Sequence, residues 1–238
     1  MNRLSIIIPV YNEGKTISSV IETINVLELI NGVKKQVIIV DDCSTDESNE
    51  MIRQSLEKIS NPNFQLIRHE VNLGKGGAIH TGIQKAEGDY TIIQDADLEL
   101  DPGEINLLLE KVLYTEANVV YGSRFLKKGF KGGSTMSNWA NSFLTRLSNT
   151  IFRIRITDME TCYKLVPTDE FKSLNLVEQR FGFEPEITAK LAKNRKLKWA
   201  EVAISYNARS EEQGKKIGWK DGFRAIWCIL KYGLSSKR

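Results

Sequence analysis

The first half of the chain repeats one pattern, in which a short β-branched, apolar segment is followed by a longer and more polar one. The apolar segments begin at Leu4, Gln36, Phe64, Tyr90 and Asn118, at intervals of 32, 28, 26 and 28 residues. These intervals match the length of a strand–helix–strand unit, and nearly continuous apolar strands are typical of parallel sheets buried on both faces. The pattern therefore predicts an α/β fold with a mostly parallel sheet and helices on both faces.

The rest of the chain fits further elements around this sheet. Residues 16–29 and 102–113 have the apolar spacing of amphipathic helices. In the second half we expect helices over 138–152, 184–193 and 218–232, a strand over 200–206, and a loop over 126–137, which is rich in Gly, Lys and Ser. Because no shift in composition marks a boundary, we predict one domain over residues 1–238 with two halves, 1–122 and 123–238.

Composition excludes several classes of protein. The chain has 238 residues, 41% hydrophobic and 26% charged, which rules out disordered, collagen-like and coiled-coil proteins. A net charge of +3 is too small to argue for nucleic acid, and we expect no such partner. Cys43, Cys162 and Cys228 form neither a disulfide framework nor a metal-binding pair, which predicts a reducing, cytoplasmic location. Apolar runs 4–10 and 225–230 are too short for a secretion leader or a membrane span, so we expect neither.

Carboxylates follow three of the expected strands. Glu13 comes after the first strand, Asp41 and Asp42 after the second, and Asp95 and Asp97 after the fourth. Ligands of open α/β sheets bind where the carboxyl ends of the strands meet. Like charges gathered at one edge are unfavourable without a cation or ligand donors, so this edge is the expected site.

The segment Asp95-Ala96-Asp97-Leu98-Glu99 is the sharpest motif at that edge. In an extended chain its three carboxylates alternate onto one face, where their oxygens suit Mg²⁺ or Mn²⁺. The other interpretation is a solvated acidic turn that leads into a helix at Asp101-Pro102. That interpretation is favoured for the short motif alone and weakened by the other strand-end carboxylates.

Two further groups of residues suggest phosphate binding. The turn Asn72-Leu73-Gly74-Lys75-Gly76-Gly77 opens an expected helix and can offer N–H groups to phosphate, although a glycine turn with no ligand explains it as well. Basic residues of the second half follow strands or lie in the glycine-rich loop, where a solvated surface charge is the alternative for each. They are Arg124, Lys127, Lys128, Lys131, Arg209 and Lys216. His69 and His80 belong to no hydrolase or zinc motif.

The order of the motifs resembles that of a known family. They are IIIPVYNE, VDDCSTD, NLGKGGA, DADLE, YGSRF, TDMETCYK, FGFEPEI and SYNARSEEQGKKIGWKDGF. The series resembles the family-2 glycosyltransferases of GT-A fold, and most closely their branch of dolichol-phosphate mannose synthases and polyprenyl-phosphate glucosyltransferases. The first four motifs are common to the broad family, and the later Arg-containing motifs are narrower. The resemblance implies that residues 1–122 bind a nucleotide sugar and that residues 123–238 form the acceptor side.

Roles follow from the resemblance, position by position. Donor binding would fall to Pro9, Tyr11, Glu13, Val40, Asp42, Lys75, Asp95, Ala96 and Asp97, and metal binding to Asp95, Asp97 and Glu99. Acceptor and donor phosphates would be held by Arg124, Arg209, Lys216, Lys215 and Arg146, and Asp158 and Glu184 would support these groups. Asp97, Asp95 and Arg124 would be catalytic. The family often has Gln at the position of Glu99. In the family the last Arg and the following Lys are usually one residue closer together, so Lys215 and Lys216 are alternatives for that Lys. The family's second acceptor-binding Arg aligns with Phe143 of this chain, and Arg146 lies nearby.

The implied reaction is the metal-dependent, inverting transfer of a sugar from UDP-glucose, GDP-mannose or a similar donor to a polyprenyl or dolichyl phosphate. A monophosphate is largely dianionic at pH 7, so this nucleophile needs no strong base. Such an acceptor implies a membrane surface. Residues 217–234 have the pattern of an interfacial helix, although a helix packed on the protein fits equally well. We expect a peripheral protein at the cytoplasmic face, and a homodimer or a separate membrane partner stays open.

Two other functions fit the same residues. The first is transfer to a hydroxyl acceptor, which needs a carboxylate base such as Asp158 or Glu184. The second is a nucleotide-sugar-binding module without turnover, against which the intact Asp95, Asp97 and Arg124 argue. A nucleotidyltransferase requires a glycine-rich, basic signature after the first strand, where this chain has the acidic PVYNE.

Overall fold

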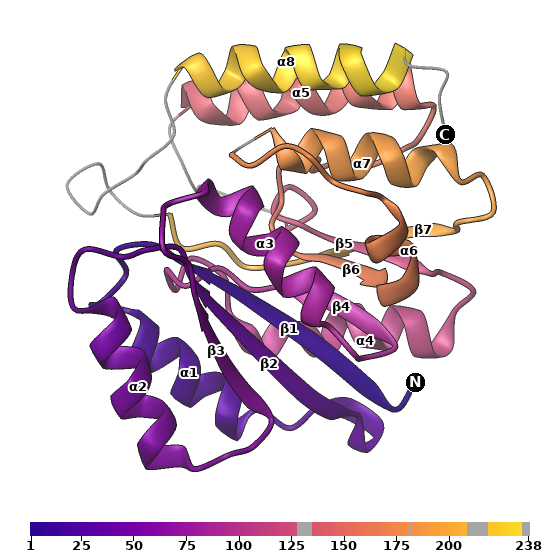
Figure 1. The fold of residues 1–238 in the computed structure, drawn as a ribbon. Helices are drawn as coiled ribbons and strands as arrows, with labels where there is room; N and C mark the ends of the chain where they lie inside the picture. The colour runs from indigo at the N-terminus through magenta and orange to yellow at the C-terminus, as the bar shows by residue number, and fades with distance from the viewer. Residues whose placement is uncertain (128–134, 181, 209–218, 235–238) are drawn as a thin grey trace.

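The computed structural model of the chain describes residues 1–127, 135–180, 182–208 and 219–234, and these form one seven-stranded sheet covered by helices (Figure 1). The strand order is β3-β2-β1-β4-β6-β5-β7. The strands are β1 (Arg3–Val10), β2 (Lys34–Asp41), β3 (Phe64–Arg68), β4 (Tyr90–Ile93), β5 (Val119–Ser123), β6 (Lys164–Pro167) and β7 (Trp199–Ala203). The five strands expected in the first half are confirmed, and the expected strand 200–206 ends earlier, at Ala203.

One strand of the sheet was not expected. β6 runs antiparallel between β4 and β5, whereas every other strand pair in the sheet is parallel. Its apolar pattern is only Leu165-Val166, with the buried Lys164 before it and Pro167 after it. With a charged first residue and only two apolar residues after it, this strand shows no hydrophobic pattern that could have predicted it.

The helices occupy both faces of the sheet, as predicted (Figure 1). Helices α1, α2 and α4 lie on one face and α3, α6 and α7 on the other, while α5 and α8 lie side by side beyond α7. They are α1 (Ile17–Val26), α2 (Ser48–Ile59), α3 (Gly74–Lys85), α4 (Ile105–Tyr114), α5 (Thr135–Phe152), α6 (Thr168–Ser173), α7 (Phe183–Lys193) and α8 (Trp219–Leu234). Short 3-10 turns η1 (Ile30–Gly32) and η2 (Pro102–Glu104) precede β2 and α4.

The core of the fold lies on both faces of β1 and β2. Isoleucine and valine side chains of these strands are fully buried, which is the burial expected of central parallel strands. Helix α3 lies close over β1 because Gly82 has no side chain: a Cβ atom there would come within 2.4 Å of the Ile7 side chain. Within the described ranges, no helix is both long enough and apolar enough to span a lipid bilayer.

Candidate active site at the carboxyl edge of the sheet

Residues predicted from separate strands gather at one edge of the sheet. The parallel strands β1, β2, β4, β5 and β7 all end there, and the antiparallel β6 begins there. The edge is therefore built from the segments 11–16, 42–48, 94–99, 124, 158–163 and 204–207. This is the edge at which open α/β sheets bind ligands.

The turns that follow β1 and β2 are locked together. The backbone N–H of Asn12 donates to Ser44 Oγ (3.1 Å), and the Asn12 side-chain oxygen accepts from the N–H of Thr45 (2.9 Å). The N–H of Glu13 donates to Ser48 Oγ (2.8 Å). Asn12 takes a left-handed backbone conformation with φ 55°, which places its side chain against the second turn. These bonds fix the position of the expected nucleoside-binding residues.

Three of those expected residues differ in burial: two lie in the core and one at the surface. Pro9 and Val40 are register partners on β1 and β2, and both are buried. Tyr11, just past the end of β1, is exposed. The Thr16 hydroxyl donates to the carbonyl of Ala96 (2.7 Å), which ties this corner to the turn that carries the acidic motif.

Asp42 is buried and bonded to the glycine turn. Its Oδ1 accepts from the Leu73 N–H (2.8 Å) and lies 2.7 Å from Nδ1 of His69, and its Oδ2 accepts from the Gly74 N–H (2.7 Å). The Gly77 N–H is bound as well, to a backbone carbonyl (3.1 Å). These three N–H groups are satisfied within the protein, so for them the other interpretation, a glycine turn with no ligand, holds.

The acidic motif is a folded turn and not an extended strand. β4 ends at Ile93, and Leu98 takes a left-handed conformation with φ 59°, which is strained for a branched apolar residue. The Glu99 N–H donates to Asp97 Oδ1 (3.1 Å) across this turn. The expected alternation of carboxylates along an extended segment is thus wrong. On the other side of the turn, Asp95 Oδ1 is paired with Lys75 Nζ at 2.5 Å.

Negative charge is concentrated at this turn. The pKa of Asp97 is raised to about 7 by its burial and by the charges of Asp95 and Glu99. Burial alone would lower the pKa of Lys75, yet neighbouring acidic groups, Asp95 first, hold it well above its usual value. In the part of the chain that the structure describes, no three His, Cys, Asp or Glu side chains are placed to hold one ion. Metal binding by Asp95, Asp97 and Glu99 stays a prediction.

Arg124, directly after β5, is held by a buried carboxylate. Its Nε and Nη2 donate to the two oxygens of Asp158 (2.7 and 2.8 Å), and Asn141 of α5 donates to Asp158 as well (3.0 Å). Burial alone would raise the pKa of Asp158, and the guanidinium overrides it and lowers that pKa. The guanidinium carbon of Arg124 lies 5.0 Å from the ring centre of Tyr206, whose hydroxyl donates to Glu99 (2.8 Å). Tyr206, which the sequence did not single out, therefore contacts both the basic and the acidic side of the edge.

A second buried ion pair lies between those two sides. Glu184, at the start of α7, accepts from the Lys164 ammonium, which lies in β6 and donates to the Thr161 carbonyl. Glu160 lies close by with its Oε1 buried and without a hydrogen-bond partner. The pKa of Glu160 is raised to about 7, first by burial and then by the charge of Glu184. Lys164 and Glu160 belong to the quoted motif TDMETCYK, and their charge inside a buried segment was the signal that could have marked them.

The remaining basic residues are placed only in part. Arg146 is exposed on α5, about 140° around the helix from Asn141, so it projects away from the residue that contacts Asp158. Its phosphate-binding role stays a prediction. Arg209, Lys215 and Lys216 lie outside the described residues, as do Lys128 and Lys131.

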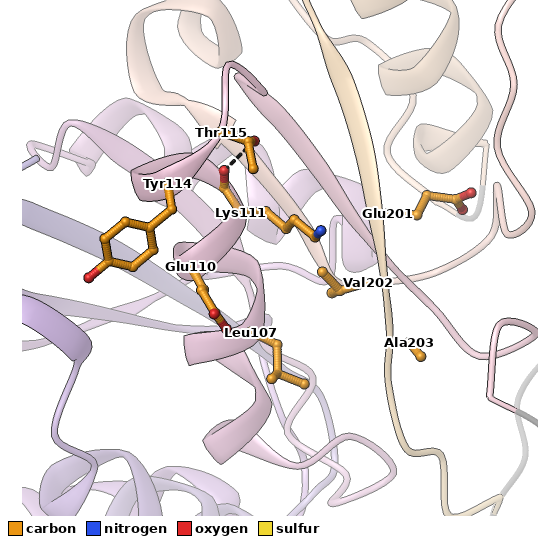
Figure 2. Close-up of a pocket in the computed structure, with 8 residues that line it drawn as sticks. All are labelled: Leu107, Glu110, Lys111, Tyr114, Thr115, Glu201, Val202 and Ala203. Atoms are coloured by element: carbon orange, nitrogen blue, oxygen red, sulfur yellow. Dashed lines mark hydrogen bonds between the residues drawn. The ribbon is translucent and has the colours of Figure 1, made fainter.

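A groove of 440 Å³ lies elsewhere, between α4 and the edge strand β7. Figure 2 shows its lining, which comprises Leu107, Glu110, Lys111, Tyr114, Thr115, Glu201, Val202 and Ala203. It contains none of the residues that the sequence predicted for the site. The convergence of the strand ends, and not the volume of this groove, therefore identifies the candidate active site.

A family comparison matches most of the chain. The family described as glycosyl transferase family 2 matches residues 5–169. A dolichyl-phosphate beta-glucosyltransferase of Trichomonas vaginalis is 28% identical over 90% of this chain and 68% of its own length. A dodecaprenyl-phosphate galacturonate synthase of Rhizobium johnstonii is 23% identical over 95% of this chain and 65% of its own length.

Solved structures agree on the fold. Glucosyl-3-phosphoglycerate synthase from Mycobacterium tuberculosis, in complex with UDP, has a TM-score of 0.73 at 18% identity and covers 99% of this chain and 82% of its own. The same enzyme with Mn²⁺, UDP and phosphoglyceric acid has a TM-score of 0.70 at 17% identity, covering 98% and 78%. The predicted GT-A fold is confirmed.

Proposed function

This chain belongs to glycosyltransferase family 2, and from that premise we propose that it transfers a sugar, with inversion, from a nucleotide sugar to a polyprenyl phosphate. One observation carries the proposal: Tyr206 joins the acidic turn, through Glu99, to the guanidinium of Arg124. A diphosphate leaving group and a phosphate nucleophile require an acidic, cation-binding surface beside a basic one. The relatives named for dolichyl and dodecaprenyl phosphate support the choice of acceptor.

On the donor side, the nucleoside would lie at the ends of β1 and β2. Pro9 and Val40 would form its floor, and the exposed Tyr11 and Glu13 would flank it. Asp42 would act mainly by holding the turn that carries Lys75, because its carboxylate is bonded to that turn. UDP and GDP are both proposed as the nucleotide of the donor.

The acidic turn fits a divalent cation. Mg²⁺ is usually held through one or two carboxylates together with phosphate oxygens and water, so a set of three protein ligands is not required. The raised pKa of Asp97 reflects its burial and the crowded negative charge of Asp95 and Glu99. Asp95 and Asp97, with Glu99 beside them, would hold Mg²⁺ or Mn²⁺. The ion would neutralise the departing diphosphate.

On the acceptor side, Arg124 would bind the phosphate. Asp158 holds the guanidinium in one orientation by a bidentate pair, and the remaining N–H donors of its fork suit a phosphate oxygen. Arg209, Lys215, Lys216 and Arg146 are proposed as further phosphate-binding residues. Catalysis would then come from positioning and from charge stabilisation.

The competing function, transfer to a hydroxyl, needs a carboxylate base. Asp158 has a lowered pKa because Arg124 outweighs its burial, which makes it a weak base. Glu184 is engaged by the Lys164 ammonium. Both bases expected from the sequence are thus paired with a cationic side chain, which supports an acceptor that is already ionised. A phosphate monoester, with a second pKa of about 6, meets that requirement.

The acceptor implies a lipid surface, and we place α8 at it. Phe223, Trp227, Leu230 and Leu234 are all exposed, and their spacing puts them on one stripe of the helix. A stripe of this kind with basic neighbours suits the boundary between headgroups and acyl chains. The protein would then be peripheral, at the cytoplasmic face.

Product analysis tests the proposal. The chain is incubated with labelled UDP- and GDP-sugars, Mn²⁺, and either a polyprenyl phosphate in detergent or a panel of glycan acceptors. We expect label in the lipid phase as an alkali-resistant, acid-labile sugar phosphate. Label transferred only to glycans would favour the hydroxyl acceptor, and donor binding without any product would favour a binding module.

A further inference from the structure

A buried carboxylate outside the site binds helix α8. Glu178 lies in the segment between α6 and α7, and its Oε2 accepts from Arg224 through Nη2 (2.6 Å) and Nε (3.2 Å). Its Oε1 accepts from the Tyr232 hydroxyl (2.7 Å) and from Lys231 Nζ (3.2 Å). Only 5% of Glu178 is exposed. One side chain thus binds three residues spread over more than two turns of α8.

The carboxyl group of Glu178 is negatively charged in the folded protein. Burial alone would raise its pKa, but hydrogen bonds from Tyr232, Arg224 and Lys231 lower that pKa to about 2. The carboxylate is therefore ionised at neutral pH. A charged acceptor with several donors forms stronger hydrogen bonds than a neutral one.

The backbone of the same segment lies against the glycine turn at the start of α3. The Gly77 N–H donates to the Gln179 carbonyl (3.1 Å). A Cβ atom at Gly76 would lie 2.2 Å from the Glu178 carbonyl oxygen, and one at Gly74 would lie 2.7 Å from the Gln179 oxygen. This close approach accounts for Gly74 and Gly76, and it leaves the turn little freedom to move apart from residues 178–179.

The glycine turn in turn holds two residues of the proposed donor side. The Gly74 N–H donates to Asp42 Oδ2 (2.7 Å), and Lys75 Nζ pairs with Asp95 Oδ1 (2.5 Å). A continuous path of packed and hydrogen-bonded groups therefore runs from α8 through Glu178 to Asp42 and Asp95. Coupling between distant sites is carried by contiguous chains of packed and hydrogen-bonded groups of this kind, and the coupling itself is what the experiment below measures.

The outer end of this path is the exposed stripe of α8. Arg224 and Lys231, which bind Glu178, also lie over the ring of Trp227, at 4.5 and 4.4 Å from its centre. Trp227 belongs to the apolar stripe that we place at the lipid surface. A shift of α8 at a membrane would act first on the two cations that Glu178 binds.

We propose that Glu178 is a positioning residue for the donor nucleotide. Through it, the affinity for the nucleotide depends on whether α8 is docked, that is, bound to Glu178 through Arg224, Lys231 and Tyr232. The inference rests on the proposed function, because it takes Asp42, Lys75 and Asp95 as the donor side. By thermodynamic linkage the coupling is reciprocal. A nucleotide that binds more tightly when α8 is docked on Glu178 also stabilises the docked position of α8.

The test compares Glu178→Gln with the unaltered chain and with Asp89→Asn. Asp89 is the control: its carboxylate is also a hydrogen-bond acceptor, for the backbone N–H groups of Asn2 (2.5 Å) and Arg3 (3.1 Å), but it is exposed and lies at the opposite edge of the sheet. Calorimetric titration with UDP or GDP and Mn²⁺ gives the Kd. We expect E178Q to weaken binding about five- to tenfold, within the usual range of coupling between sites, and D89N to leave it unchanged.

Hydrogen exchange supplies a readout that a purely structural role would not move. Nucleotide should slow amide exchange in residues 224–234 of the unaltered chain and should not do so in E178Q. Equal Kd values for E178Q and the unaltered chain would overturn the inference while leaving the proposed function intact. No nucleotide binding by the unaltered chain would overturn both. If E178Q fails to fold, Tyr232→Phe, which removes one bond of the cluster, serves instead, and an unchanged Kd together with faster exchange of α8 would overturn the inference.

Discussion

Arg124 and Asp158 form a bidentate ion pair at the carboxyl edge of the sheet, with N–O distances of 2.7 and 2.8 Å. The backbone N–H of Arg124 donates to the same carboxylate (3.1 Å). These three hydrogen bonds to one buried carboxylate fix the orientation of the guanidinium. Asp158 therefore determines the direction of the Arg124 side chain.

The first prediction concerns that orientation. Asp158→Asn should reduce kcat/KM for the polyprenyl phosphate about 10- to 100-fold, because a displaced guanidinium no longer meets the acceptor phosphate. The Kd of the nucleotide should stay the same. Steady-state kinetics with each substrate varied separately provides the measurement. Glu116→Gln, at an exposed ion pair with Lys198, is the control. A loss confined to nucleotide binding would show that Arg124 serves the donor.

The second prediction concerns the acidic turn. Asp97→Ala should lower turnover at least about 10²-fold, because on the proposed function this carboxylate would help to hold the cation that neutralises the leaving diphosphate. The fold should persist, since removal of a carboxylate with a pKa raised to about 7 by burial and by neighbouring charges also relieves repulsion. Melting temperature and turnover are measured on the same preparation. Activity near that of the unaltered chain, with Mn²⁺ present, would refute the role of Asp97.

The third prediction is a pH dependence of stability. Burial and the charge of Glu184 raise the pKa of Glu160 from 4.5 to about 7, so the folded chain binds a proton that the unfolded chain has released. The free energy of unfolding therefore falls as the pH rises from about 4.5 to 7. Glu160→Gln resembles the protonated form and should be more stable than the unaltered chain at pH 8, by about 1–3 kcal/mol. Denaturant melts at pH 5 and pH 8 measure the effect. A variant that is less stable at both values would show that the charged form is needed.

The fourth prediction concerns the lipid surface. The double substitution Phe223→Ser and Leu230→Ser should reduce flotation with vesicles of phosphatidylethanolamine and phosphatidylglycerol, because it removes apolar area from the exposed stripe of α8. Val26→Ser, at an exposed valine of α1 on the other face of the sheet, is the control. Unchanged flotation of the double variant would place the membrane contact elsewhere.

Much of the fold could be predicted from the sequence, because its periodic signals are strong. The βα repeat located β1 to β5, since buried parallel strands need uninterrupted apolar runs. The short antiparallel β6 could not be found, because Lys164 takes up a buried position that is stabilised by an ion pair with Glu184, twenty residues away.

The site could be predicted in outline but not in its bonding. The rule that ligands bind at the carboxyl ends of strands located the edge. It could not show that Leu98 adopts a left-handed backbone, which folds the acidic motif into a turn. Nor could it show that Asp42 binds the N–H groups of Leu73 and Gly74, because that contact joins residues about thirty positions apart. Local sequence patterns do not predict contacts between residues that are far apart in the sequence.

A crystal of the chain soaked with Mn²⁺ and UDP or GDP tests the central claim most directly. We expect a metal ion bound by Asp95 or Asp97, the diphosphate beside it, and the nucleoside over Pro9 and Val40. A nucleotide bound elsewhere, with no metal at either aspartate, would contradict the assignment of this edge as the donor site.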